Sequence, residues 1–163
     1  MKLPERIYLN IEIMGKHKII TNVLLPNMRK ESELIVDTGA SFTLISHELF
    51  KKLKLPVKDR AITKVIGLNS VEDSYSTLIP SFKIGNIDLG EVRVAVAELH
   101  KNFQESVILG MNILGCFNFN LSISNKEIEL RPRYRGNTVV WGRCLKVKDT
   151  NIEDLLNLAI ENK

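Results

Sequence analysis

The residues best suited to chemistry form one short segment, Leu34-Ile35-Val36-Asp37-Thr38-Gly39-Ala40-Ser41. In this segment, three apolar residues typical of a buried strand precede a carboxylate, and a small hydroxyl residue and a glycine follow it. Because such a strand ends in the core, Asp37 is expected at a tight turn close to low-dielectric surroundings. Hydrogen bonds from neighbouring groups can hold the carboxylate there, and Gly39 lets another backbone approach closely. A carboxylate held in this way is a candidate general base for a water molecule.

A purely structural interpretation of Asp37-Thr38-Gly39 is also open, because Asp and Gly are common turn residues. The wider segment favours the chemical interpretation. Residues 36–55, VDTGASFTLISHELFKKLKL, resemble the active-site segment of retropepsin-like aspartic proteases. In that family an apolar strand leads into the Asp-Thr-Gly turn, and a second strand and a short helix follow.

A second motif of the same family follows in the expected order. The segment Val107-Ile108-Leu109-Gly110-Met111-Asn112-Ile113-Leu114 resembles the apolar-apolar-glycine segment that packs behind the catalytic turn in the family's ψ-shaped loop. About 70 residues separate the two motifs, and the sequence between them is rich in predicted strands. The resemblance covers roughly residues 5–130. It implies a mostly β, retropepsin-like closed barrel (the acid protease fold) with a short internal helix, to which the sequence adds a C-terminal helix.

The number of Asp-Thr-Gly segments bears on the assembly. Aspartic proteases use two carboxylates that share a proton, whereas this chain has one such segment. The near-copy Asp88-Leu89-Gly90 lacks the hydroxyl residue and is predicted to be a hairpin turn. One chain therefore holds half a site. The resemblance implies a homodimer with twofold symmetry, in which Asp37 of each subunit meets at the axis.

The resemblance also implies individual roles around the turn. Asp37 would be the catalytic carboxylate, in an active-site loop completed by Thr38, Gly39, Ala40 and Ser41. Thr38 would brace the turn through hydrogen bonds across the dimer axis. Gly39 would contact the substrate backbone, and Ser41 would hydrogen-bond to the carboxylate.

Two further groups of residues are assigned by the same resemblance. Ile66, Gly67 and Leu68 lie where the family has its flap, a lid that binds the peptide and excludes water. This flap departs from the family pattern, because Gly67 is its single glycine. Leu109, Gly110 and Asn112 belong to the ψ-shaped loop, and Asn112 is predicted to be a structural hydrogen-bonding residue rather than a catalytic one.

The elements that must position these residues are mainly short strands, predicted from alternating or continuous apolar runs. They are expected at residues 6–14, 18–25, 33–36, 42–45, 61–68, 75–79, 91–97, 107–110, 117–123 and 127–130. Residues 69–73 are expected to be a polar turn. A short helix is predicted over Ser46–Leu53, with Ser46 as its N-cap, and a turn of helix over 111–114.

Composition sets outer limits on the function. The chain has 163 residues, of which 44% are hydrophobic and 26% charged, as expected for one ordinary soluble domain. The net charge of +4 does not by itself favour nucleic acid, and no apolar run approaches the roughly 20 residues that span a bilayer. Without an export signal, Cys116 and Cys144 are predicted to be reduced thiols in the cytoplasm. The three histidines are scattered, so neither a metal nor another cofactor is predicted.

The composition changes near the C-terminus, where basic residues cluster at Arg131, Arg133, Arg135, Arg143, Lys146 and Lys148. A final amphipathic helix is predicted from about Asn151 to Asn162. We therefore expect a protease domain over residues 1–130 and a basic extension over residues 131–163. The basic run is predicted to be a solvated face, and contact with nucleic acid or an acidic partner is the alternative.

The sequence thus predicts an aspartic endopeptidase that binds peptide or protein substrates and acts through water activated between two Asp37 carboxylates. The main alternative is a catalytically inactive module of the same fold that binds peptides or dimerises, because a fold does not guarantee a function. A third hypothesis is a small regulatory protein whose basic C-terminal part binds nucleic acid.

Overall fold

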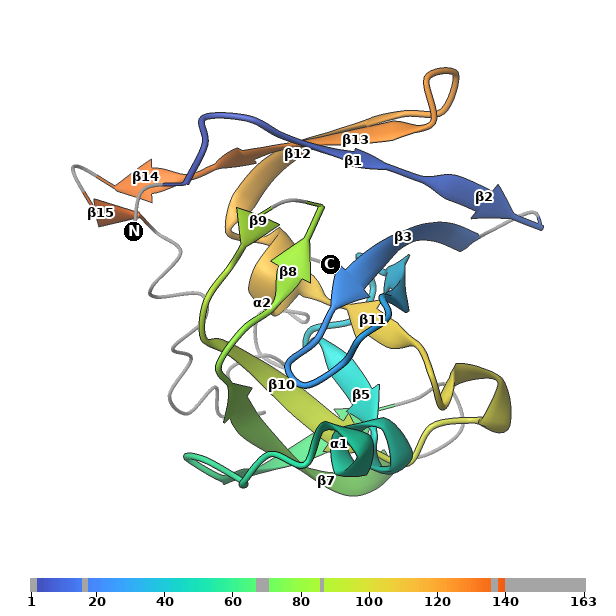
Figure 1. The fold of residues 1–163 in the computed structure, drawn as a ribbon, viewed down its shortest axis with the longest axis vertical. Coiled ribbons are helices and arrows are strands. Elements are labelled where there is room, and N and C mark those ends of the chain that lie inside the picture. Colours follow the sequence, from blue (N-terminus) through green and yellow to red (C-terminus); the bar gives the residue numbers. More distant parts are fainter. Residues whose placement is uncertain (1–2, 16–17, 67–70, 86, 136–137, 140–163) are drawn as a thin grey trace, which may run out of the picture.

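The computed structural model describes residues 3–15, 18–66, 71–85, 87–135 and 138–139, and they form mostly short β-strands (Figure 1). A ten-stranded sheet curls around the core, in the order β6-β7-β10-β5-β11-β4-β3-β8-β9, with β2 paired to β3. Its strands are β2 (Glu12–Met14), β3 (Lys18–Leu24), β4 (Ser32–Val36), β5 (Leu44–Ser46), β6 (Ala61–Ile66), β7 (Val71–Ile79), β8 (Lys83–Ile84), β9 (Ile87–Asp88), β10 (Val92–Ala97) and β11 (Val107–Leu109).

A second sheet of three strands lies at one end of the molecule, at the top of Figure 1. It has the order β1-β13-β12, formed by β1 (Ile7–Asn10), β12 (Phe117–Ser122) and β13 (Glu127–Pro132). Buried and exposed residues alternate along β1, as expected for a strand with one face on the core. A two-stranded ribbon follows β13 in the chain and consists of β14 (Tyr134–Arg135) and β15 (Thr138–Val139).

The helices are short and begin where the sequence predicts. In α1 (His47–Leu53), the Ser46 hydroxyl caps the first turn by accepting a hydrogen bond of 2.9 Å from the Leu49 N–H. Leu49, Phe50 and Leu53 bury one face of this helix. The turn of helix predicted at residues 111–114 is α2 (Met111–Leu114), and a 3-10 turn, η1 (Lys101–Phe103), precedes β11.

Two predicted boundaries are wrong. The strand predicted over residues 6–14 breaks at Ile11, whose N–H donates to the Lys126 carbonyl at 2.9 Å. The chain changes sheets there, because β1 pairs with β13 whereas β2 pairs with β3. Residues 71–73 were expected in a turn but belong to β7, since the ladder with β6 continues to Ile66↔Val71. Backbone pairing does not depend on side-chain polarity, so a polar stretch can extend a hairpin.

The core contains the apolar side chains that the strand patterns predict, with Leu34, Ile45, Ile79 and Phe82 among the most deeply buried. In the described part of the chain, no helix is long and apolar enough to cross a membrane. β13 continues through Arg131 to Pro132, past the predicted domain boundary. The division at residue 130 stays a prediction. The predicted helix at residues 151–162, Cys144 and the basic residues from Arg143 onward lie outside the described residues.

Candidate active site

Asp37 lies on a loop between two strands that do not pair with each other. β4 ends at Val36 and runs parallel to β11, with Val36 opposite Leu109, and β11 also pairs with β5 through Ile108 and Leu44. β11 therefore lies between the two strands that the loop of residues 37–43 connects. This is the ψ-shaped arrangement that the two sequence motifs predict. The Asp37 N–H fastens the start of the loop to the Leu109 carbonyl at 3.1 Å.

The Asp37 turn is closed by its own backbone. The Gly39 N–H donates to Asp37 Oδ1 at 2.9 Å, and the Ala40 N–H donates to the Asp37 carbonyl at 3.2 Å. Beyond the turn, the Ala40 and Ser41 carbonyls accept hydrogen bonds of 2.7 and 3.0 Å from the first backbone N–H groups of α2. Ser41 thus joins the loop through its backbone, whereas Gly39 supplies the hydrogen bond to the carboxylate.

The surroundings of Asp37 differ from the sequence expectation. Asp37, Thr38 and Gly39 are exposed in the single chain, although a turn close to low-dielectric surroundings was expected. The reason is that β4 ends at the surface of the sheet rather than inside the core. The Asp37 carboxylate is therefore open to solvent, to a ligand or to a second copy of the chain.

Asn112 joins three segments behind the loop and is 9% exposed. Its Oδ1 accepts from the Thr43 N–H at 2.7 Å and from the Thr43 hydroxyl at 2.8 Å, and its Nδ2 donates to the Arg93 carbonyl at 2.9 Å. The Thr43 hydroxyl in turn accepts from the Gly110 N–H at 3.1 Å. Buried polar groups need such partners, and here they hold together β10, α2 and the residue directly before β5. These contacts support a structural role for Asn112.

Gly110 is placed where the loop passes closest to α2. Its φ of −100° is accessible to any residue, so glycine is needed there for space alone. A Cβ on Gly110 would lie 2.3 Å from both the carbonyl carbon and oxygen of Phe42 and 2.8 Å from the Thr43 nitrogen. The start of α2 therefore packs directly against the backbone of the Asp37 loop at Gly110.

The predicted flap lies on the β6–β7 hairpin. Its residues pair from Ala61↔Ser76 to Ile66↔Val71, whereas β10 pairs with β7 only over Tyr75–Ile79. The outer part of the hairpin thus extends beyond β10. Ile66 forms the last pair before the turn, and Gly67 and Leu68 lie outside the described residues.

Sequence reasoning missed two residues that complete this site. Thr43 is the polar residue of the strand predicted over residues 42–45 and lies directly before β5, and a buried polar residue in an apolar run indicates that a hydrogen bond is needed. Arg93 lies in the strand predicted over residues 91–97, where its charge would favour the solvent side, yet it is buried with the rest of β10. Both faces of β10 are covered, so its alternation does not indicate exposure.

The near-copy at Asp88 has the same local geometry but other surroundings. The Gly90 N–H donates to Asp88 Oδ1 at 2.8 Å, as Gly39 does to Asp37. Asp88 belongs to β9 and pairs with Lys83, so it ends the β8–β9 hairpin instead of forming the predicted hairpin turn. Ser81 and the Phe82 N–H also donate to its carboxylate. Partial burial by itself would raise the pKa of Asp88, but these hydrogen bonds outweigh it and lower the pKa.

Asp88 is consequently expected to stabilise the fold in a pH-dependent way. A carboxyl group whose pKa is lower in the folded state adds stability above its unfolded-state pKa and loses it as the pH falls through the folded value. Asp88→Asn should lower the free energy of unfolding by about 1–2 kcal/mol at neutral pH and by less in acid. Urea unfolding at both pH values measures the difference. An equal loss of unfolding free energy at the two pH values would contradict a lowered pKa of Asp88. Ser81→Ala, which removes one donor to the carboxylate, should reproduce part of the loss.

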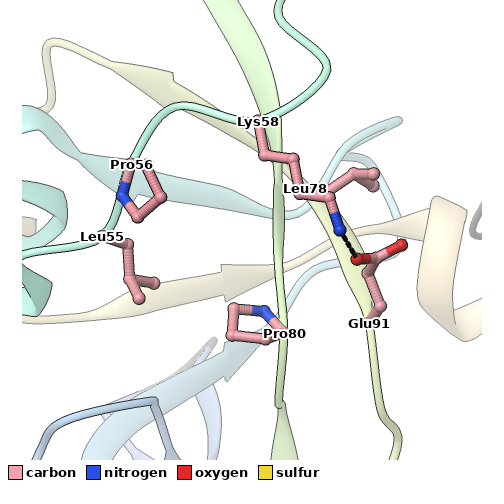
Figure 2. A pocket seen from close by; sticks show the side chains of 6 residues that line it. All are labelled: Leu55, Pro56, Lys58, Leu78, Pro80 and Glu91. Carbon is pink, nitrogen blue, oxygen red and sulfur yellow. Dashed lines mark hydrogen bonds and ion pairs between the residues drawn. The ribbon is translucent and has the colours of Figure 1, made fainter.

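An apolar pocket of about 170 Å³ lies elsewhere on the surface and contains none of the predicted site residues (Figure 2). It is lined by Leu55, Pro56, Lys58, Leu78, Pro80 and Glu91, and an exposed Lys58–Glu91 ion pair of 2.6 Å borders it. Within the described ranges, no three His, Cys, Asp or Glu side chains gather as a metal site would require. Among the described residues, the Asp37 loop is therefore the candidate active site.

Residues 27–113 match the protein family described as aspartyl protease. The match covers more than half of the chain, so the chain belongs to the aspartyl protease family. The structure is similar to a retropepsin-like aspartic protease from Rickettsia conorii, with a TM-score of 0.56 and 20% sequence identity over 78% of this chain and 90% of that one. The mostly β, retropepsin-like fold predicted from the sequence is confirmed.

A similarity to EIAV protease complexed with the inhibitor HBY-793 is weaker, with a TM-score of 0.49. The sequences are 22% identical, and the alignment covers 61% of this chain and 88% of that one. No curated protein matches the chain in sequence.

Proposed function

We propose that this protein is an aspartic endopeptidase that hydrolyses peptide bonds as a homodimer. The observation that carries the proposal is the Asp37 carboxylate, exposed on a loop that the ψ-shaped arrangement fixes at both ends. Within the described residues, the Gly39 N–H is its one hydrogen-bond donor, so most of its acceptor capacity is free. One such carboxylate per chain is half of what the reaction needs.

The chemistry follows from bringing two Asp37 carboxylates together. Two like charges in close contact do not both stay ionised, so the pair holds one proton. The ionised carboxylate takes a proton from a water molecule while the water oxygen attacks the peptide carbonyl carbon. The protonated carboxyl donates its proton to the carbonyl oxygen. When the resulting tetrahedral intermediate collapses, the carboxyl that took the proton from water passes it to the amine, and the C–N bond breaks. A hydroxyl of the intermediate returns a proton to the other carboxylate as the new carboxyl group forms. No covalent enzyme intermediate forms.

The substrate would lie extended between the Asp37 loops and the β6–β7 hairpins. The predicted flap residues Ile66, Gly67 and Leu68 would then cover it. An extended peptide can add to exposed hairpin strands through backbone hydrogen bonds. Digestion of a peptide library by the full chain, with the products read by mass spectrometry, tests the proposed activity. New N- and C-termini at internal peptide bonds are the expected products, and an intact library at every pH from acid to neutral would refute it.

The outer edge of β12 offers the surface for the second copy. Of the described strands, only β13 pairs with β12, and none of them covers its other edge. Phe119 on this strand is 41% exposed although it lies opposite Leu130, which is 1% exposed. An open edge that carries an apolar side chain favours pairing with another strand. β12 also follows α2 directly, and α2 is bonded to the Asp37 loop, so a β12–β12 contact would place the two loops near each other.

Phe119→Lys is expected to weaken the dimer by at least about tenfold in Kd, because a buried charge at a paired edge is unfavourable. Peptidase activity should then fall at low protein concentration and recover at high concentration. Tyr8→Lys is the matched control, since Tyr8 is 52% exposed on β1 at the other edge of the same sheet. Sedimentation equilibrium measures both variants. Equal dimer stability in the two would exclude the β12 edge.

A further inference from the structure

Arg93 links two segments of the proposed site. Its side chain bonds to residues at the base of the β6–β7 hairpin, and its backbone carbonyl bonds to Asn112 behind the Asp37 loop. It is 5% exposed, in the strand β10, all of whose residues are buried. Its Nη1 donates to the Asp59 carbonyl at 2.8 Å and to the Ser76 hydroxyl at 3.0 Å, and its Nη2 forms an ion pair with the Asp59 carboxylate. Its backbone carbonyl accepts the hydrogen bond from Asn112 Nδ2.

The side-chain contacts of Arg93 fix the entrance of the β6–β7 hairpin. Asp59 lies two residues before β6 and has a φ of +52°, a left-handed conformation that residues other than glycine rarely adopt. The preceding residue, Lys58, is held to Thr77 of β7 by hydrogen bonds of 2.8 and 2.9 Å. The guanidinium therefore holds a strained turn at the point where the hairpin leaves the body of the protein.

The backbone of Arg93 belongs to the network behind Asp37. Asn112, which donates to the Arg93 carbonyl, also accepts from the Thr43 N–H and hydroxyl, and that hydroxyl accepts from the Gly110 N–H. Burying a guanidinium is unfavourable unless it is fully paired, and Arg93 Nε has no partner among the described residues. An apolar side chain would fill β10 without that cost. The charge is thus better explained by what it positions than by stability.

We propose that Arg93 is a positioning residue that sets the orientation of the β6–β7 hairpin relative to the Asp37 loop, and so determines how tightly an extended peptide is held between them. The inference rests on the proposed peptidase function. Arg93 would then link the β6–β7 hairpin to the Asp37 loop.

Steady-state kinetics of the full chain with a cleaved peptide test the proposal. Arg93→Met removes the charge at similar volume and should raise KM by at least about tenfold, with a smaller change in kcat. Asp59→Asn should raise KM in the same direction, and the double variant should be no worse than Arg93→Met, because both remove one interaction. Arg93→Lys should restore part of the loss, since a lysine keeps the charge but not the forked geometry.

Glu91→Gln is the matched control, because it removes the exposed Lys58–Glu91 ion pair between the same two segments. It should leave KM and kcat unchanged. If Arg93→Met lowers the unfolding midpoint while the folded fraction keeps the wild-type KM, the role is structural only and the proposal is wrong. If Arg93→Met does not fold, the KM of Asp59→Asn tests the proposal instead. This variant is expected to fold because the Asp59 side chain is half exposed.

Amide hydrogen exchange separates this inference from the peptidase proposal. Arg93→Met should speed exchange both at the start of β6 and at Thr43 and Asn112, and Glu91→Gln should speed it at neither. Faster exchange at both segments in Arg93→Met, together with an inactive wild-type protein, would support the positioning role of Arg93 and refute the peptidase proposal. Unchanged exchange at either segment would overturn the link, whether or not the protein cleaves peptides.

Discussion

Asp37→Asn is expected to abolish peptide hydrolysis while the fold and the dimer persist. An asparagine can still accept the hydrogen bond from the Gly39 N–H, so the turn should keep its shape. It can neither take a proton from water nor carry the shared proton of a carboxylate pair. We expect kcat/KM to fall by at least about a thousandfold. Peptide cleavage measures the loss, and sedimentation velocity checks the dimer.

Asp88→Asn is the matched control for this prediction. Asp88 has the same hydrogen bond to a glycine two residues later, but its remaining acceptors are occupied by Ser81 and Phe82. This variant should retain wild-type peptidase activity at temperatures where it is folded. Cleavage by Asp37→Asn at the wild-type rate would place the catalytic group elsewhere.

Gly110→Ala is expected to have the largest effect on stability. The added methyl group would meet the Phe42 backbone at 2.3 Å, and the loop that carries Asp37 would have to move. Clashes of side chains can be relieved by rotation, whereas this one is with backbone atoms. We expect a loss of about 3–5 kcal/mol in the free energy of unfolding, or failure to fold.

Gly15→Ala provides the comparison, because nothing lies within 4 Å of its Cβ position. Its φ of +61° makes alanine unfavourable there, by about 1 kcal/mol. Urea unfolding of both variants separates lack of space from backbone strain. A Gly110→Ala protein as stable as Gly15→Ala would mean that the loop is not packed against Gly110.

Local patterns in the sequence were sufficient to predict the Asp37 turn and the Ser46 cap. Each of these depends on residues within a few positions of one another. Thr43 and Asn112, by contrast, are 69 positions apart, and their hydrogen bond exists only because β11 lies between β4 and β5. Pairing of this kind cannot be obtained from periodicity.

The burial of Arg93 and the exposure of Asp37 were missed for a related reason. A charged residue in an alternating strand is normally expected on the solvent side, but β7 and β5 flank β10 and its residues are buried on both faces. Asp37 follows a run of apolar residues and was expected close to the core, yet β4 ends at the surface. Counting carboxylates indicated half a site per chain, and this stays a prediction.

The central claim, that two chains share one catalytic site, is tested most directly by mixing wild-type chains with Asp37→Asn chains. The mixtures are refolded together at a constant total concentration that favours dimers, and the rate of peptide cleavage is followed against the wild-type fraction. A shared site predicts that activity falls with the square of this fraction, to about a quarter in an equal mixture. A linear fall, to about a half, would show that each chain carries a complete site of its own.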